Sequence, residues 1–115
     1  MKRFKYPFEG LYYITSKDYH FIAHLLTSVA VIICGFIFKI DAVEWLFIVS
    51  AIFAVLILET LNTALEETVD LVTNEYHPLA KHAKDIAALA VLLACIYAVV
   101  VGMIVFFPKI LLLFN

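Results

Sequence analysis

Three long apolar runs are the feature that most limits what this chain can fold into. They cover residues 21–38, 43–58 and 86–107, and the third carries no charged side chain. A helix of about 20 apolar residues crosses a hydrocarbon core of about 30 Å, so the runs have the length of membrane spans. A soluble helical bundle would need a polar face on every helix, and the third run has none. The sequence therefore predicts an all-α membrane protein.

The chain is expected to form one integral-membrane domain over residues 1–115. The expected elements are an amphipathic surface helix at about 3–17 and membrane spans at about 21–38, 43–63 and 86–107, assembled as an oligomeric helical bundle. The first two spans are expected to join through a tight turn, and the helix of the second to continue to about Val72. Pro78 suits the first turn of the next helix, since proline is favoured there.

The surface helix is predicted from a stripe of apolar residues. Phe4, Phe8, Leu11 and Tyr12 recur at helical spacing, as in helices that lie in a membrane interface. Proline and glycine within this segment, at positions 7 and 10, weaken a helix, so we expect it to be short or bent.

Basic side chains are distributed unevenly around the expected spans. Six flank one side and two flank the other: Lys2, Arg3, Lys5, Lys17, Lys81 and Lys84 against Lys39 and Lys109. Cytoplasmic loops are enriched in lysine and arginine, so this pattern predicts a cytoplasmic N-terminus. The net charge of −2 gives no reason to expect a nucleic-acid partner.

A row of polar residues continues directly from the second apolar run. Glu59, Asn62, Glu66 and Asp70 are spaced i, i+3, i+7 and i+11, which places them on one helix face. At 1.5 Å per residue, Glu59 lies about 24 Å along the helix from Val43, and the two later acids lie about 35 and 41 Å along it. Glu59 is thus expected near headgroup depth, and ionisable residues in such positions indicate a functional site.

The chemistry expected of this row is phosphoryl transfer to an alcohol. Neighbouring carboxylates repel one another unless a cation intervenes, and Mg²⁺ binds through one or two carboxylates, water and substrate phosphates. Glu59, at the end of the row nearest the membrane, could take a proton from a lipid hydroxyl. Lys84 could neutralise a transferring phosphoryl group. The alternative for the acids off this row is a solvated surface, which we favour for Glu67 and Glu75.

Other candidate residues carry weaker signals. Asp18 is expected at the same depth as the acidic row. His20 and His24 have the i, i+4 spacing of zinc ligands, but no further histidine or cysteine joins them in sequence, so His24 is interpreted as a polar packing residue. The chain has no glycine-rich phosphate-binding loop, which excludes a P-loop enzyme.

Taken together, these motifs resemble the small bacterial integral-membrane lipid kinases, which comprise diacylglycerol kinase and undecaprenol kinase. The matching segments are Glu59-Thr-Leu-Asn62-Thr63-Ala64-Leu-Glu66, Val69-Asp70, Tyr76-His77-Pro78-Leu-Ala-Lys81-x-Ala-Lys84-Asp85, Ala90-Val-Leu-Leu and Phe8-x-Gly10-Leu11. The resemblance covers nearly the whole chain. It implies a homotrimer in the bacterial inner membrane, with active sites between subunits that use Mg²⁺ and ATP.

The resemblance also assigns roles to residues. It implies that Glu59 is the general base, that Glu66 and Asp18 bind the metal, and that Glu59 and Asp70 contact the lipid. It implies nucleotide or phosphate contacts from Asn62, Glu66, His77, Lys84, Asp85 and Tyr6. Asp18 departs from the family, which has a glutamate there, and Leu89 stands where many undecaprenol kinases have glycine.

The expected function is ATP- and Mg²⁺-dependent phosphorylation of a membrane lipid alcohol at the cytoplasmic face. Undecaprenol is the preferred substrate, because residues 77–81 are more similar to that branch, and diacylglycerol is the alternative. A non-catalytic membrane subunit or an ion-conducting oligomer remains a third reading, although a pore would need acids deep within a span.

The site is expected to be shared between chains, since three helices are too few to enclose both a lipid and a nucleotide. On this expectation, Glu59 and Asp18 are candidates to reach one site from different subunits.

Overall fold

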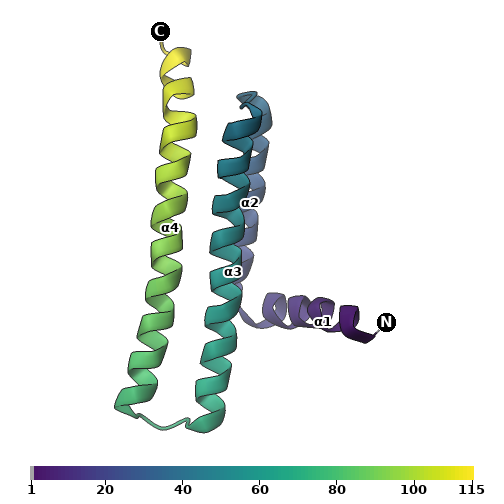
Figure 1. Ribbon diagram of the computed structural model, residues 1–115, viewed down its shortest axis with the longest axis vertical. Coiled ribbons are helices and arrows are strands. Elements are labelled where there is room, and N and C mark those ends of the chain that lie inside the picture. The colour runs from purple at the N-terminus through teal and green to yellow at the C-terminus, as the bar shows by residue number, and fades with distance from the viewer. Residues whose placement is uncertain (1) are drawn as a thin grey trace.

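The computed structural model describes residues 2–115, and these form four helices. They are α1 (Lys2–Lys17), α2 (Tyr19–Ile37), α3 (Ala42–Val72) and α4 (Pro78–Leu113). The three long helices run side by side and α1 lies crosswise to them, as Figure 1 shows. All three long helices are long and apolar enough to cross a membrane. The predicted fold class is therefore confirmed, while Met1, the first residue of the expected domain, lies outside the described residues.

Helix α1 differs from its prediction, because it is one continuous helix of 16 residues. Pro7 lies in its second turn, so it removes only one backbone hydrogen bond, close to the end of the helix. The apolar stripe points away from the other helices: the exposed fractions of Phe8 and Tyr12 are 72% and 76%, whereas Ile14 is buried. This is the arrangement of a helix whose stripe lies in a membrane interface.

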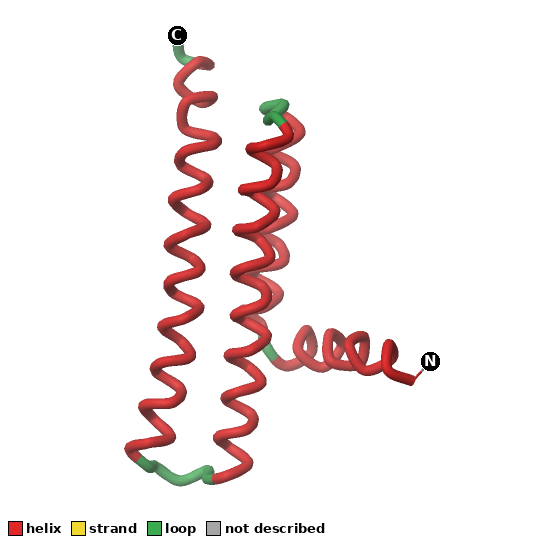
Figure 2. The backbone as a smooth tube through the Cα atoms, in the orientation of Figure 1, coloured by secondary structure: helices red, strands yellow, loops and turns green. Residues whose placement is uncertain are grey.

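The turn between α2 and α3, drawn as a short loop in Figure 2, is held by two capping motifs. At the end of α2, Ile40 N–H donates to the Gly35 carbonyl (3.2 Å) and Lys39 N–H to the Phe36 carbonyl (3.3 Å). Lys39 takes a φ of 53°, the left-handed conformation that this helix ending requires. At the start of α3, a capping box joins residues 41 and 44. The predicted tight turn is confirmed.

The core lies where the α2–α3 turn, α3 and α4 meet. Its buried residues are Ile40, Ile48, Ala51, Val101 and Val105. Helix α3 packs mainly against α4 and less extensively against α2. Ion pairs link α3 to α4 near both ends, Glu44 to Lys109 and Asp70 to Lys84, each at 2.6 Å. Helix α3 is therefore the central element, and the polar row is carried on it.

Gly35 provides a first prediction, about stability. A Cβ atom at this position would lie 2.5 Å from the Trp45 ring, whereas a Cβ at Gly102 would meet nothing within 4 Å. Overpacking of this kind costs about 1–3 kcal/mol, so Gly35→Ala should lower the unfolding midpoint in a denaturing-detergent titration. Gly102→Ala is the matched control and should be neutral or stabilising, since alanine favours helix. Equal midpoints for the two variants would contradict this account of the α2–α3 contact.

Candidate active site

The inner part of the site surrounds Glu59 in the middle of α3. Glu59 is the only charged or polar residue classed as buried within the described chain, with an exposed fraction of 6%. Its Oε2 lies 3.7 Å from the His24 Nε2 of α2. A carboxyl group enclosed in this way costs free energy unless polar neighbours compensate, so its burial points to a function.

Asp18 connects the start of α2 to α3. It is the N-cap of α2, where its Oδ1 accepts from the His20 backbone N–H at 2.9 Å, and its Oδ2 accepts from the Thr63 hydroxyl at 2.9 Å. Burial raises the pKa of Asp18, but hydrogen bonds involving Glu59, Thr63 and the backbone N–H groups of residues 21 and 20 outweigh it, so the pKa lies below its ordinary value. Asp18 therefore stands beside Glu59 as a fixed anionic group.

Asp18 and Glu59 also lie close together within one chain. The Asp18 carboxylate is near enough to Glu59 of the same chain for each group to act electrostatically on the other. They are candidates to reach one site from different subunits, and the α2 N-cap also brings them together within one subunit. That the site is shared between chains stays a prediction.

Asn62 and Glu66 lie together further along the same face of α3. The Asn62 Nδ2 donates to the Glu66 Oε1 at 3.2 Å. The Asn62 Oδ1 is buried and has no hydrogen-bond partner among the described residues. An unpaired amide oxygen beside a carboxylate is a donor set that suits Mg²⁺, which prefers oxygen ligands. Across residues 2–115, however, no three histidine, cysteine or acidic side chains form a metal-binding group.

The outer part of the site is a polar cavity of about 300 Å³ between the ends of α3 and α4. Its lining includes three of the predicted residues, Asp70, His77 and Lys84. Lys84 Nζ lies 2.6 Å from the Asp70 Oδ1 and donates a hydrogen bond to it. A cationic group thus borders a solvent-facing hollow at the loop end of the molecule.

Three of the predicted nucleotide-contact residues either have partners in their own helix or lie on another part of the molecule. His77 is the N-cap of α4, and its Nδ1 accepts a hydrogen bond from the Leu79 N–H at 3.1 Å. One of its two ring nitrogens is therefore already engaged in capping the helix. Asp85 pairs with Lys81 one turn away at 2.6 Å, and both side chains are exposed. Tyr6 is exposed on α1, which projects away from the α3–α4 loop (Figure 1).

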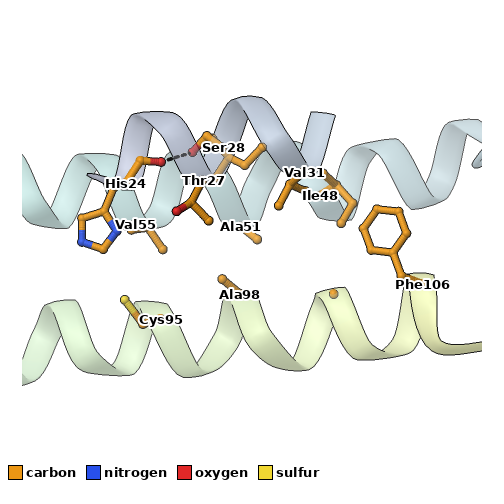
Figure 3. A pocket seen from close by; sticks show the side chains of 12 residues that line it. His24, Thr27, Ser28, Val31, Ile48, Ala51, Val55, Cys95, Ala98 and Phe106 are labelled. Carbon is orange, nitrogen blue, oxygen red and sulfur yellow. Dashed lines mark hydrogen bonds between the residues drawn. The ribbon is translucent and has the colours of Figure 1, made fainter. Parts of the chain in front are cut away.

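A second, apolar cavity of about 240 Å³ lies among α2, α3 and α4. In Figure 3, His24 stands at one end of this cavity and Phe106 at the other, with Ala51 and Ala98 facing each other between them. Val55, one turn of α3 from Glu59, also lines it. The cavity therefore runs along the hydrocarbon-spanning part of the helices and ends beside the inner part of the site.

His24 and Thr63 are site residues that the sequence reasoning missed. Thr63 follows Glu59 by four residues, so helical spacing already places it near that face. His24 gave no comparable signal, because its partner Glu59 lies on another helix, 35 positions along the chain. Its interpretation as a packing residue omitted the contact that the structure shows.

The sequence of the chain is similar to those of several known proteins. The sequence profile of a family described as prokaryotic diacylglycerol kinase matches residues 5–106. An undecaprenol kinase of Bacillus subtilis (strain 168) is 40% identical over 108 residues, which cover 94% of this chain and 88% of that protein. A diacylglycerol kinase of Synechocystis sp. is 43% identical over 109 residues, covering 94% of this chain and 62% of that protein. A diacylglycerol kinase of Escherichia coli (strain K12) is 43% identical over 61 residues, 53% of this chain and 50% of that protein.

Proposed function

We propose a reaction for this chain from the premise that it belongs to the prokaryotic diacylglycerol kinase family. It is a membrane lipid kinase, for which ATP is the phosphate donor. The proposed reaction is transfer of the γ-phosphoryl group of ATP to the hydroxyl of a lipid alcohol at the cytoplasmic face. The observation that carries this proposal is the buried Glu59 beside the end of an apolar cavity.

The lipid is proposed to place its hydrocarbon chain in the apolar cavity and its hydroxyl at Glu59. The cavity is lined mainly by apolar side chains at the depth of the spans. Glu59 lies one helical turn beyond Val55 of that lining, so a chain in the cavity would present its polar end there. This arrangement brings the hydroxyl of a water-insoluble lipid to the Glu59 carboxyl group. Neither polar group then has to face the hydrocarbon of the bilayer.

In the proposed reaction, Glu59 accepts the proton of the lipid hydroxyl while the hydroxyl oxygen attacks the γ-phosphorus of ATP. The new O–P bond forms while the bond between the γ-phosphorus and the β–γ bridging oxygen breaks, and ADP leaves. Such reactions depend on positioning and on neutralising the charge of the transferring group. Lys84, at the outer cavity, is proposed to supply part of that neutralisation.

Mg²⁺ is proposed to bind at the face between the two parts of the site. Glu66, the unpaired Asn62 Oδ1 and Asp18 are the residues that would hold it. When bound, the ion would neutralise phosphate charge and orient the nucleotide. His77 and Asp85, near Lys84, and Tyr6 of α1 are proposed nucleotide contacts, and Asp70 a further substrate contact.

Glu66→Gln tests the metal assignment. Because a hard cation loses an anionic oxygen ligand, this variant should need a higher Mg²⁺ concentration for half-maximal activity, with less effect at saturating Mg²⁺. The measurement is a Mg²⁺ titration of ATP-dependent lipid phosphorylation. Glu75→Gln, in the α3–α4 loop, is the control, and an unchanged Mg²⁺ dependence in Glu66→Gln would remove Glu66 from the metal site.

Undecaprenol is the proposed substrate, with diacylglycerol as the alternative. One relative matched over most of both chains is named undecaprenol kinase, while others, one of them of similar identity, are named diacylglycerol kinase. Purified protein incubated with labelled ATP, Mg²⁺ and separate pools of each lipid would distinguish them. Preferential labelling of the polyprenol supports the proposal, and preferential labelling of diacylglycerol overturns it.

The assembly and orientation are proposed as a homotrimer with a cytoplasmic N-terminus in the bacterial inner membrane. Helix α1, the start of α2 and the α3–α4 loop lie toward one end of the bundle, and the α2–α3 turn and the C-terminus toward the other (Figure 1). Helix α1 carries four of the eight Lys and Arg residues, and the first two turns of α4, next to the loop, carry two more, which supports a cytoplasmic location for this end.

A further inference from the structure

We propose that His24 is a positioning residue for Glu59, holding its carboxyl group in the orientation that receives the proton of the lipid hydroxyl. The inference rests on the proposed function, because it takes Glu59 as the group that accepts this proton.

The contact between the two side chains crosses from α2 to α3. The His24 Nε2 lies 3.7 Å from the Glu59 Oε2, and their side chains are 27% and 7% exposed. This separation is just beyond hydrogen-bonding range, so a shift of less than 1 Å would form the bond. Catalytic contacts are often longer before substrate binds and shorten in the productive complex.

The cavity explains why the orientation of Glu59 depends on such a neighbour. His24 is the ionisable side chain at the α2 side of this otherwise largely apolar lining (Figure 3). Few solvent molecules can reach a carboxyl group at this depth, and a hydrogen bond is stronger in such a medium than in water. The imidazole therefore lies where the hydrocarbon-lined space gives way to the carboxyl groups.

The start of α2, which leads to His24, is held against α3 by a further contact. The Asp18–Thr63 hydrogen bond holds the start of α2 against α3, six residues before His24. Glu59 of α3 is the ionisable group in contact with His24, and Cys95 of α4 lines the same cavity. Asp18 and Glu66 act on Glu59 itself, and His20 lies one helical turn before His24.

The test compares two amide substitutions that differ in reach. In His24→Gln the amide nitrogen can take the place of Nε2 and still donate to Glu59, whereas in His24→Asn it takes the place of Nδ1 and falls short. We expect His24→Asn to lower kcat by about 10²-fold, the scale of effect that a misplacement of about 1 Å can cause. His24→Gln should keep kcat within a few-fold of the parent chain, and KM for ATP should be unchanged in both.

Controls separate this role from a structural one. His20→Asn, one helical turn earlier on an exposed part of α2, should leave kcat unchanged. Full kcat in His24→Asn, an equal loss in His24→Gln, or a change confined to KM would each overturn the inference. If His24→Asn does not fold, as judged by its unfolding midpoint, His24→Gln decides alone, because a large loss of kcat in that variant contradicts positioning by a donated hydrogen bond.

Glu59→Gln, assayed in parallel, separates a failure of the positioning role of His24 from a failure of the proposed role of Glu59. Inactive Glu59→Gln with active His24→Asn refutes only the role of His24. Active Glu59→Gln refutes the proposed function of Glu59, and the inference about His24 with it.

Discussion

Replacing Glu59 with glutamine is expected to lower lipid phosphorylation by about 10²–10⁴-fold, the usual contribution of a general base. The amide has nearly the size and shape of the carboxyl group but cannot accept the proton of the lipid hydroxyl. Glu59 is buried next to Asp18 and His24, so no bulk water replaces it as an acceptor. The measurement is initial-rate kinetics with labelled ATP at saturating Mg²⁺ and lipid, together with direct titration of nucleotide binding.

Glu67→Gln is the matched control for this prediction. Glu67 is on the same helix but exposed, as expected for a solvated acid off the polar row, so its substitution should leave turnover nearly unchanged. Nucleotide binding should survive in both variants, because Glu59 lies about 10 Å along α3 from Glu66. Near-normal turnover in Glu59→Gln would exclude it as the base, and loss of nucleotide binding would assign it to a different role.

The helices could be predicted from the sequence because their signals are local. Apolar length predicted the three long helices, and Pro78 at the first turn of α4 follows from its missing N–H. The continuity of α1 was not predicted, since propensity alone counts Pro7 as a breaker irrespective of its distance from the helix end. The left-handed conformation of Lys39 was also outside local rules, which favour glycine there.

The candidate site was predictable where its residues share one helix. The spacing of Asn62 and Glu66 predicted the neighbours that the structure shows to be hydrogen-bonded. Contacts between helices were not accessible in this way, because the packing angle and register of α2 on α3 are set by side chains spread along both. The approach of His24 to Glu59 and the Thr63–Asp18 hydrogen bond both depend on that register.

Asp18 shows how the structure changes the meaning of a sequence difference. The resemblance to the family implies a glutamate at this position, and the shorter side chain at first suggests a poorer metal ligand. Here the aspartate caps α2, a task for which aspartate is among the best residues, and it also accepts from Thr63. A glutamate in its place would gain reach but lose the cap, so the shorter acid couples the site to the start of α2.

Replacing Lys84 with methionine is expected to lower turnover by about 10²–10³-fold, the range seen when one preorganised donor to a developing charge is removed. In the present structure, Lys84 pairs with Asp70 at the polar cavity. Both side chains are more than one third exposed, and such pairs contribute little to stability, so methionine should not unfold the chain. The lysine is thus available to exchange a solvated carboxylate for a phosphate group.

Lys81→Met is the matched control, because it removes a lysine from the same cavity lining one turn away. Lys81 pairs with Asp85 within its own helix, so its loss should change turnover far less than the loss of Lys84. Asp70→Asn provides the opposite perturbation, since it releases Lys84 and should leave the affinity for ATP unchanged or raise it. The measurements are kcat and KM for ATP at constant ionic strength. Equal effects of Lys84→Met and Lys81→Met would mean that the cavity attracts nucleotide only by its overall charge, and the specific role of Lys84 in phosphoryl transfer would then be rejected.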